Sequence, residues 1–427
     1  MLFNGTTGDD VITGTASNDL FEMQSGGDDI VIAGAGNDVI AFGASFTAAD
    51  VVDGGTGNDE ILLDGNYNTR VIFGTGNLTS VETVAVTAGS DYLLGDNALS
   101  SRLTLTVDGS ALGTGDQLDF QASGVSGRLI LDGGAGGDIL MAGSGNDRIV
   151  AGGGNDYIRP GSGDNSVNAG SGNDTIIFNA GETFTTAGSI DGGTGTDALW
   201  ITGNYTAPLV FASLSVTNVE SIILGGGSFD ITIADNTVAA GKVLSVSGQG
   251  LTAADSLTFR GGADTDGILS IGGGPGNDML VAGAGNDYLD GALGADVLTG
   301  GPGYDIFGFE SGAVSSTGVN FDHVTDLSAA IDRFELQTAV TGVDATVVGG
   351  ALSLATFDTQ LAAAIGATQL HLSHAVLFEP TTGDQHGHTF LVVDANGVAG
   401  YQAGQDLVVD VSGMTGTLTA ANFFTFH

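Results

Sequence analysis

Residues 131–178 read LDGGAGGDI LMAGSGNDR IVAGGGNDY IRPGSGDNS VNAGSGNDT IIF. In this stretch aspartate recurs every nine residues, at Asp138, Asp147, Asp156 and Asp174, and Asn165 occupies the remaining position. A short fixed period indicates a repeat architecture, in which each unit buries its apolar face against its neighbours. We therefore expect nine-residue units rather than an ordinary globular core.

The same unit occurs in two further blocks. Residues 272–307 repeat it with the same spacing, a looser run opens the chain, and isolated copies GGTGND and GGTGTD end at Asp59 and Asp197. Fourteen aspartates then share one motif position: Asp10, Asp19, Asp29, Asp38, Asp59, Asp138, Asp147, Asp156, Asp174, Asp197, Asp278, Asp287, Asp296 and Asp305. Thirteen follow a glycine two residues earlier, with Ser17 before Asp19 as the exception, and all fourteen precede an apolar residue by two positions.

This residue pattern predicts a turn that can bind a cation, followed by a short strand. Glycines permit positive φ angles and leave backbone carbonyls accessible, while the aspartate adds a charged oxygen. The apolar residue after the aspartate points inward on a strand of about three residues. Two units would complete one coil, so that aspartates eighteen apart, such as Asp138 and Asp156, stack on one edge.

The charge balance of the chain is consistent with bound cations. Acidic residues number 50 against 8 lysines and arginines, and the formal net charge is −42. Stacked carboxylates about 4.8 Å apart repel one another, so ion binding and folding should be coupled. Because 42% of residues are apolar, the chain is not expected to be disordered, and its charge excludes a nucleic-acid partner. There is no cysteine, so no disulfide or thiolate site is expected.

The nonapeptides resemble the GGxGxDxUx repeats of the RTX family, clearly over 131–178 and 272–307 and more weakly over 5–61. The resemblance implies an all-β fold, a parallel β-roll or β-helix solenoid that binds several calcium ions. Its implied ligands are the fourteen aspartates, Asn165 as a neutral ligand, and carbonyls of the glycine turns, such as those of Gly134, Gly143, Gly152, Gly274 and Gly283. The pattern departs from the family at Asn165 and at Thr15 and Ser17. The alternative is a glycine-rich linker without metal.

A larger duplication separates the repeat blocks. The segment LTSVETVAV at 78–86 parallels VTNVESIIL at 216–224, and DQLDF at 116–120 parallels DSLTF at 255–259. We expect repeat blocks at 1–61, 131–199 and 271–309, with inserts at 62–130 and 200–270 in which the solenoid continues with wider coils. These inserts resemble parts of bacterial S-layer and other surface proteins.

Residues 310–427 are expected to form a mostly-β capping region. The segments 321–336 and 390–411 resemble the C-terminal region of RTX proteins exported by type I secretion. This resemblance implies that the type I secretion machinery is a partner. Asp326 and Asp332 are weaker candidate ligands, with the alternative that they only cap the segment between them. Asp394 and Asn396, in the loop DANGVAGYQAGQD, are also weaker candidates, because this loop is similar to an EF-hand loop. The alternative for this loop is an ordinary turn.

Histidines and one helix complete the expectations for this region. His371 and His374 are three residues apart, and His386 and His388 flank a glycine, so a zinc site is conceivable, but spacing alone supplies no third ligand. A short helix at 354–365 is expected to cap the exposed strand edge.

The sequence favours a secreted, calcium-binding structural protein over an enzyme. No HExxH or GxSxG motif is present, and no catalytic residue or organic cofactor is predicted. No run of 18 apolar residues suggests a membrane span. The expected role is a surface-layer, matrix, filament-forming or adhesive component, with self-assembly or cell-surface polysaccharide as further partners. The alternatives are a polysaccharide lyase or epimerase and a free calcium-binding effector.

Overall fold

A computed structural model describes residues 1–67, 71–73, 76–89, 91–95, 104–182, 187–205, 207–211, 215–309 and 320–425. The fold is all-β and built mainly from parallel strands, which confirms the expected solenoid class. The chain divides into two compact units: unit 1 contains Met1–Ile201 with Leu214–Val219, and unit 2 contains Thr202–Ser213 with Glu220–His427.

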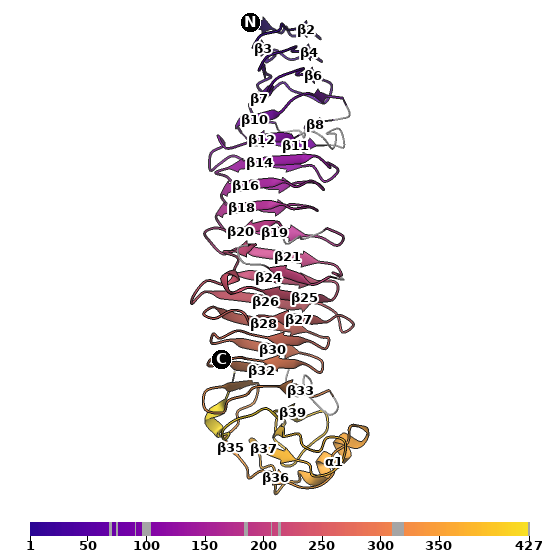
Figure 1. The fold of residues 1–427 in the computed structure, drawn as a ribbon, viewed down its shortest axis with the longest axis vertical. Coiled ribbons are helices and arrows are strands. Elements are labelled where there is room, and N and C mark those ends of the chain that lie inside the picture. The colour runs from indigo at the N-terminus through magenta and orange to yellow at the C-terminus, as the bar shows by residue number, and fades with distance from the viewer. Residues whose placement is uncertain are drawn as a thin grey trace. The chain divides into compact units, whose positions relative to one another are not determined.

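Unit 1 contains three stacks of short strands, which Figure 1 draws coil by coil. The first stack runs β1 (Leu2–Asn4), β3 (Leu20–Glu22), β5 (Val39–Ala41), β7 (Glu60–Asp64), β10 (Thr83–Ala88), β12 (Thr104–Asp108), β14 (Arg128–Gly134), β16 (Arg148–Gly153), β18 (Ser166–Ser171), β20 (Ser189–Asp191) and β23 (Val216–Thr217). The second runs β8 (Val71–Phe73), β11 (Asp91–Gly95), β13 (Leu118–Gln121), β15 (Ile139–Met141), β17 (Tyr157–Arg159), β19 (Thr175–Phe178) and β21 (Ala198–Thr202). The third contains β2 (Val11–Thr13), β4 (Ile30–Ile32), β6 (Val51–Asp53) and β9 (Leu78–Thr79).

The strand register shows that two nonapeptides make one coil. Ile130 pairs with Arg148, and Arg148 pairs with Ser166, each step being eighteen residues. On the second stack Tyr157 pairs with Thr175, again eighteen residues on. Consecutive nine-residue units therefore alternate between the two stacks, and units eighteen apart lie directly above one another.

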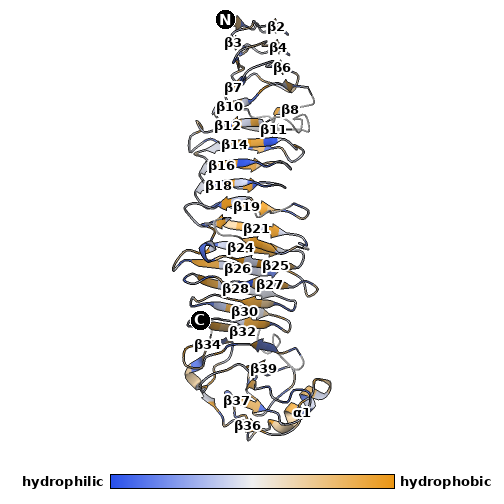
Figure 2. Cartoon of the chain, viewed as in Figure 1, coloured by the Kyte–Doolittle hydropathy of each residue, from blue (hydrophilic) through white to orange (hydrophobic). Residues whose placement is uncertain are grey.

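The apolar residue two positions after each motif aspartate forms the core of the coil. In unit 1, Leu140, Ile149, Ile158 and Ile176 are completely buried. Their neighbours along these three- to six-residue strands are less buried, giving the alternation that a strand with one buried face produces. Figure 2 shows β19 as mainly hydrophobic.

The first insert continues the solenoid of unit 1 with longer coils. Thr83 pairs with Thr106, which is 23 residues further on, and Asp91 pairs with Leu118, which is 27 residues further on. Both pairings are parallel. The described strands of 62–130 therefore extend the same stacks that the nonapeptides form.

Unit 2 repeats this arrangement and ends in a different region. One stack runs β24 (Ser221–Gly225), β26 (Val243–Gly250), β28 (Ile268–Gly274), β30 (Tyr288–Ala292), β32 (Ile306–Phe309), β34 (Arg333–Leu336) and β40 (Phe423–Thr425). The other runs β22 (Leu209–Phe211), β25 (Phe229–Ile233), β27 (Leu257–Arg260), β29 (Met279–Val281), β31 (Val297–Thr299), β33 (Asp322–Val324), β39 (Leu407–Asp410), β38 (Phe390–Val393), β37 (His374–Glu379) and β35 (Gly342–Val343), and β36 (Val347–Val348) pairs with β37.

The duplication seen in the sequence extends to the backbone of the two inserts. Ser80 and Asn218 occupy equivalent positions at an offset of 138 residues, and both have positive φ, 51° and 53°. Positive φ is uncommon outside glycine. The shared conformation indicates that both copies turn in the same way before the strands β10 and β24.

The short helix forms where expected but packs differently. It comprises a 3₁₀ turn at Leu354–Thr356 followed by α1 (Phe357–Ala364). Phe357 and Leu361 join a buried cluster with Phe378 and Phe390, so the helix packs against strands β37 and β38. The edge of β33 is instead paired with β39, and the edge of β34 with β40. Within the described ranges, none of the helices has the length and apolarity needed to cross a lipid bilayer.

Candidate calcium-binding turns

The nonapeptide turns can form only because of their glycines. Gly152 and Gly170 have φ of 105° and 108°. A Cβ atom at Gly152 would lie 2.0 Å from the carbonyl oxygen of Gly134, and one at Gly170 would lie 2.0 Å from that of Gly152. Any side chain at these positions would collide with the backbone of the preceding coil. The glycines therefore let successive turns stack closely and bring their carbonyls near one another.

One oxygen of each motif carboxylate joins neighbouring coils. The Asp138 backbone N–H donates to Asp156 Oδ1 at 2.7 Å, and the Asp156 N–H donates to Asp174 Oδ1 at 2.8 Å. The Asp174 N–H in turn donates to Asp197 Oδ1 at 2.8 Å. We call such a series an aspartate ladder, because each carboxylate accepts a hydrogen bond from the equivalent residue one coil earlier.

Equivalent ladders run through the other repeat blocks. In unit 2 the Asp278 N–H donates to Asp296 Oδ1 at 2.7 Å and the Asp287 N–H to Asp305 Oδ1 at 3.0 Å. In the N-terminal block the donors are Asp10, Asp19, Asp29 and Asp38, one coil before their acceptors Asp29, Asp38, Asp50 and Asp59. The predicted stacking of motif aspartates is thus present in each block.

The second carboxylate oxygen of many ladder residues is buried without a hydrogen-bond donor. Among the described residues this holds for Oδ2 of Asp38, Asp59, Asp138, Asp147, Asp156, Asp174, Asp278, Asp296 and Asp305. The oxygen points into its own turn, since a Cβ atom at Gly133 would lie 2.4 Å from Asp138 Oδ2. At Gly300 the corresponding distance to Asp305 Oδ2 is also 2.4 Å. A buried charged oxygen without a donor is costly unless a cation compensates it.

Asn165 provides a direct comparison within the same ladder geometry. Its Oδ1 accepts from the Asp147 N–H at 2.8 Å, as a motif aspartate would. Its Nδ2, however, donates to the carbonyls of Pro160 and Gly161, both at 3.2 Å. At this turn an amide N–H satisfies the carbonyls. At an aspartate turn the carboxylate Oδ2 takes the place of this Nδ2, so a carboxylate oxygen faces the carbonyl oxygens.

Burial raises the pKa of several carboxyls in the ladders of the second and third repeat blocks. Desolvation raises the pKa of Asp138 and Asp278 to about 6, and of Asp156 and Asp305 to about 7. At Asp156 the neighbouring charges of Asp174 and Asp138 add to this effect, while the backbone hydrogen bond opposes it. At neutral pH these carboxylates therefore favour any partner that supplies positive charge.

Three of the chain's arginines are engaged outside the motif aspartates, whereas Arg128 lies close enough to Asp147 to offset in part the rise that burial causes in the pKa of that carboxyl. Within the described ranges, the arginine ion pairs are Arg148 with Asp132, Arg159 with Glu182 and Arg260 with Asp230. None of these carboxylates is a motif aspartate. The donor set around each turn consists of carboxylate and carbonyl oxygens, which suits a hard cation that takes six to eight oxygen ligands, namely Ca²⁺. The residues present therefore fit calcium.

Comparison with known families decides the nature of these turns. The model of the RTX calcium-binding nonapeptide repeat matches residues 2–22, 25–44, 47–69, 132–167, 161–184 and 272–307. These segments are RTX calcium-binding repeats. The cofactor of the RTX repeats is calcium, bound as several ions, and repeats of this kind are typical of secreted proteins. Among curated proteins, no significant match to the chain is found.

Two RTX turns near the start of the chain differ from the others. Asp10 Oδ2 accepts from the Thr6 N–H at 2.5 Å, and Asp19 Oδ2 accepts from the Thr15 N–H at 2.6 Å and from its hydroxyl at 2.9 Å. The N-terminal amine also pairs with Asp19 and lowers the pKa of that carboxyl. Threonine at this turn position thus supplies donors to an oxygen that is unpartnered in RTX turns such as those of Asp138 and Asp278.

The weaker candidates of the C-terminal region act as hydrogen-bond acceptors for the backbone. Asp332 continues the RTX ladder, because its Oδ1 accepts from the Asp305 N–H at 3.1 Å, but its Oδ2 accepts from the Ser328 N–H at 2.6 Å. The Asp326 carboxylate accepts from the N–H groups of Gly300 and Gly301. These bonds give both carboxylates partners within the protein.

The loop similar to an EF-hand is closed by its own hydrogen bonds. Asp394 Oδ1 accepts from the N–H groups of Gly397 and Val398, and its Oδ2 accepts from the Ser373 N–H at 2.7 Å. The Asn396 amide donates to the side chains of Gln402 and Gln405. This geometry favours an ordinary turn over a calcium loop.

Sequence reasoning missed several ladder residues that lack the upstream glycine. Asp50 accepts from the Asp29 N–H, Glu82 from the Asp59 N–H and Asp322 from the Asp296 N–H, at 2.8 to 2.9 Å. Each stands two residues before a buried apolar residue, as the motif aspartates do. That part of the pattern alone would have identified them. Asp264 is also buried with an unpartnered Oδ2, but it does not stand two residues before an apolar residue, so this pattern would not have identified it.

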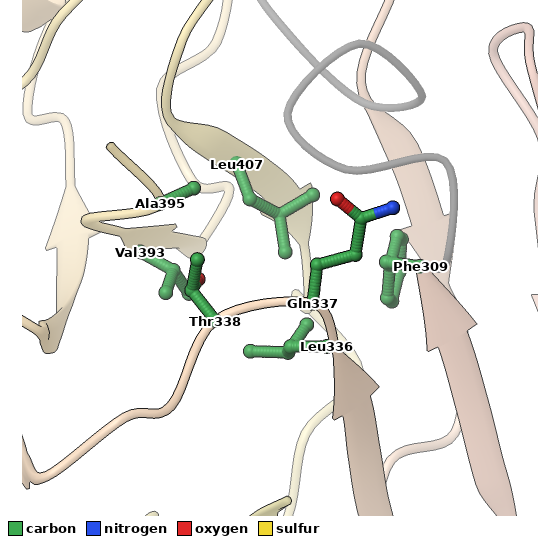
Figure 3. A pocket seen from close by; sticks show the side chains of 7 residues that line it. All are labelled: Phe309, Leu336, Gln337, Thr338, Val393, Ala395 and Leu407. Atoms are coloured by element: carbon green, nitrogen blue, oxygen red, sulfur yellow. The ribbon is translucent and has the colours of Figure 1, made fainter. Parts of the chain in front are cut away.

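A small pocket lies in unit 2, away from the ladders (Figure 3). It is lined by Phe309, Leu336, Gln337, Thr338, Val393, Ala395 and Leu407 and encloses about 40 Å³. Sites for organic substrates usually enclose several hundred Å³. This pocket has room for little more than a water molecule and offers no substrate site.

Proposed function

We propose that the unpartnered Oδ2 atoms of the ladder aspartates, together with carbonyls of their own and adjacent turns, bind calcium ions. The observation that carries the proposal is the set of buried Oδ2 atoms without donors, at Asp138, Asp147, Asp156, Asp174, Asp278, Asp296 and Asp305. Asn165 supports it, because the one neutral residue in these runs fills the same place with an N–H group. Asp10 and Asp19, whose oxygens have threonine donors, are the least dependent on an ion.

We further propose that calcium binding drives folding of the solenoid. Most motif aspartates are buried, carboxylates of neighbouring coils raise the pKa of Asp156, and three of the arginines form ion pairs elsewhere. A ligand that binds only the folded state stabilises it by an amount that grows with the logarithm of the ligand concentration once the site is saturated. The chain would remain unfolded where free calcium is scarce, as in the cytosol, and would fold after export.

The biological role that fits these properties is a structural component outside the cell. We propose export by type I secretion and assembly into a surface layer, matrix or filament, or adhesion to cell-surface polysaccharide. Support comes from RTX repeats in three blocks, separated by solenoid inserts that resemble parts of bacterial surface proteins. Support also comes from the strongly negative net charge of −42, which calcium can bridge between molecules.

Two experiments test these steps separately. Circular dichroism of the purified full chain during a calcium titration tests the coupling of binding to folding, and a chain with full β-structure in chelator would contradict it. Fractionation of producing cells before and after chelation tests the role. A surface component stays with the cells until calcium is removed, whereas a protein that accumulates in the medium with calcium present would exclude the surface role.

A further inference from the structure

Two histidines and one aspartate of unit 2 converge outside the RTX turns. Asp344 directly follows β35, whereas His371 lies in the turn before β37 and His374 is the first residue of that strand. The Nδ1 atoms of His371 and His374 are 2.8 Å and 3.0 Å from the same oxygen, Asp344 Oδ1. One potential ligand atom from each of the three residues lies within 4.8 Å of the other two.

The aspartate is held in a fixed orientation by the backbone. Asp344 Oδ2 accepts from the His371 N–H at 2.9 Å, and the Asp344 N–H donates to the carbonyl of Ala375 at 2.7 Å. One carboxylate oxygen is therefore occupied by the protein, and the other is presented to both imidazoles. This is the orientation of a carboxylate that binds through a single oxygen.

The turn between the histidines is also constrained. Ser373 has a positive φ of 55°, its carbonyl accepts from the Thr341 N–H at 2.7 Å, and its N–H donates to Asp394 Oδ2 at 2.7 Å. The His374 ring lies against Gly342, where a Cβ atom would be 2.6 Å from the ring carbon Cε1. The loop of Asp394 thus helps to position the histidines, and glycine at 342 leaves room for the ring.

We propose that Asp344, His371 and His374 bind one zinc ion through Asp344 Oδ1 and the two imidazole Nδ1 atoms. The ligand set of two nitrogens and one oxygen is typical of zinc, and it differs from the all-oxygen RTX turns, which suit calcium. Tetrahedral zinc with bonds of about 2.0–2.1 Å places its ligand atoms roughly 3.3 Å apart. The observed separations of 2.8 Å and 3.0 Å from Asp344 Oδ1 require only a small expansion.

The fourth coordination position is accessible to solvent. The His371 side chain is 59% exposed and that of His374 31% exposed, whereas Asp344 is 13% exposed. A water molecule, or a side chain from a second molecule, can complete the coordination. The surroundings also favour the ionised carboxylate. Burial alone would raise the pKa of Asp344, but the His371 N–H and the two imidazoles together lower it.

The chain offers a matched control in its other histidine pair. His388 Nδ1 lies 2.6 Å from Asp410 Oδ2, but this aspartate contacts one imidazole only, because His386 is exposed and not part of the contact. Substitution His386→Ala removes one imidazole from the same region of the chain without touching the proposed site. Any metal binding that depends merely on the number of histidines would respond to it.

The test uses the full chain without a histidine tag, saturated with calcium so that the RTX turns are occupied. Zinc is titrated in competition with a chromophoric chelator, and Co²⁺ serves as a spectroscopic probe of tetrahedral coordination. We expect one zinc per chain. His371→Ala and His374→Ala should each weaken binding by at least about 100-fold, since loss of an outer partner alone costs about 10–100-fold. His386→Ala should leave binding unchanged.

His371→Ala is the most informative variant. Because this side chain is largely exposed, its removal should not impair folding. Its calcium-dependent circular dichroism should match that of the natural chain. The proposal is overturned if zinc binds equally well to this variant, if His386→Ala weakens binding as much, or if Co²⁺ gives no tetrahedral absorption bands. It is also overturned if no saturable binding occurs with calcium present.

Discussion

Substitution Asp156→Asn should have opposite effects with and without calcium. Asp156 lies in an uninterrupted ladder between Asp138 and Asp174, and its Oδ2 is buried without a donor. Asparagine at the equivalent position 165 donates its Nδ2 to two turn carbonyls. The variant should adopt that arrangement. The variant would then lose a negatively charged calcium ligand and gain a turn whose carbonyls are hydrogen-bonded within the protein.

The magnitude can be worked from the structure. Burial raises the pKa of Asp156 from 3.8 to about 7. This shift corresponds to roughly 4 kcal/mol, of which about half is retained because water reaches part of the turn. Two new hydrogen bonds to carbonyls add about 1 kcal/mol each. In chelator the variant should therefore be more stable than the natural chain by about 2–4 kcal/mol.

The assay is circular dichroism in two conditions: folding promoted by trimethylamine N-oxide in chelator, where the natural chain is expected to be unfolded, and urea unfolding in saturating calcium. In saturating calcium the Asp156→Asn variant should be less stable than the natural chain, because it has lost a carboxylate ligand. Two control variants separate the causes. Asp156→Ala removes the charge, supplies no Nδ2 donor and also removes the Oδ1 acceptor of the Asp138 N–H, so it should fall below Asp156→Asn by at least about 2 kcal/mol in chelator. Glu22→Gln removes the same charge from an exposed strand position and should change little. Lower stability of Asp156→Asn in chelator would refute the reasoning.

Three further changes probe the same turns. Asn165→Asp should replace the Nδ2 donor by an unpartnered oxygen, so that the chain binds one more calcium ion by equilibrium dialysis and loses about 2 kcal/mol in chelator; unchanged stoichiometry would count against the proposed ligands. Acidification of the metal-free chain from about pH 8 to about pH 5 should increase its β-structure, measured by circular dichroism. Because the pKa values of carboxyls such as Asp138 and Asp156 are raised in the folded state, that state binds more protons than the unfolded state, and its stability falls as pH rises towards 7. Further unfolding on acidification would contradict this. Gly152→Ala should cost about 2–4 kcal/mol in calcium by thermal unfolding, whereas Gly115→Ala, where a Cβ atom meets nothing within 4 Å, should cost less than about 0.5 kcal/mol; equal effects would exclude close stacking as the cause.

The repeated part of the fold could be predicted because its signals are local and additive. Each nonapeptide contains its own turn glycines, its aspartate and its buried apolar residue, so the stacking of Asp138 on Asp156 follows from the nine-residue period alone. The orientation of the two carboxylate oxygens does not follow from it. Only the structure shows that Oδ1 is used between coils, while Oδ2 remains in the turn.

Contacts between segments distant in sequence explain what the sequence did not reveal. Asp344 lies 27 residues before His371, and the two meet because β35 pairs with β37. The spacing of the histidines gives no indication of this third ligand. The helix α1 is a similar case, because its composition predicts a helix but not its packing against β37 and β38. Asp394 resembled a ligand in the sequence. Its oxygens are occupied by backbone N–H groups, which are present whatever the residue type and so cannot be recognised from the sequence.

The two oxygens of each ladder carboxylate link ion binding in one turn to the conformation of the next. An ion held at Asp156 Oδ2 would fix the orientation of the whole carboxylate, and hence the position of Oδ1, which accepts from the Asp138 N–H. That N–H belongs to a turn with its own unpartnered oxygen, so ordering one turn orders the backbone of the preceding one. The ladder from Asp138 to Asp197 should therefore fill cooperatively. On the other edge the ladder passes from Asp147 to Asn165, which is ordered without an ion and so provides a fixed point from which folding of that edge can begin.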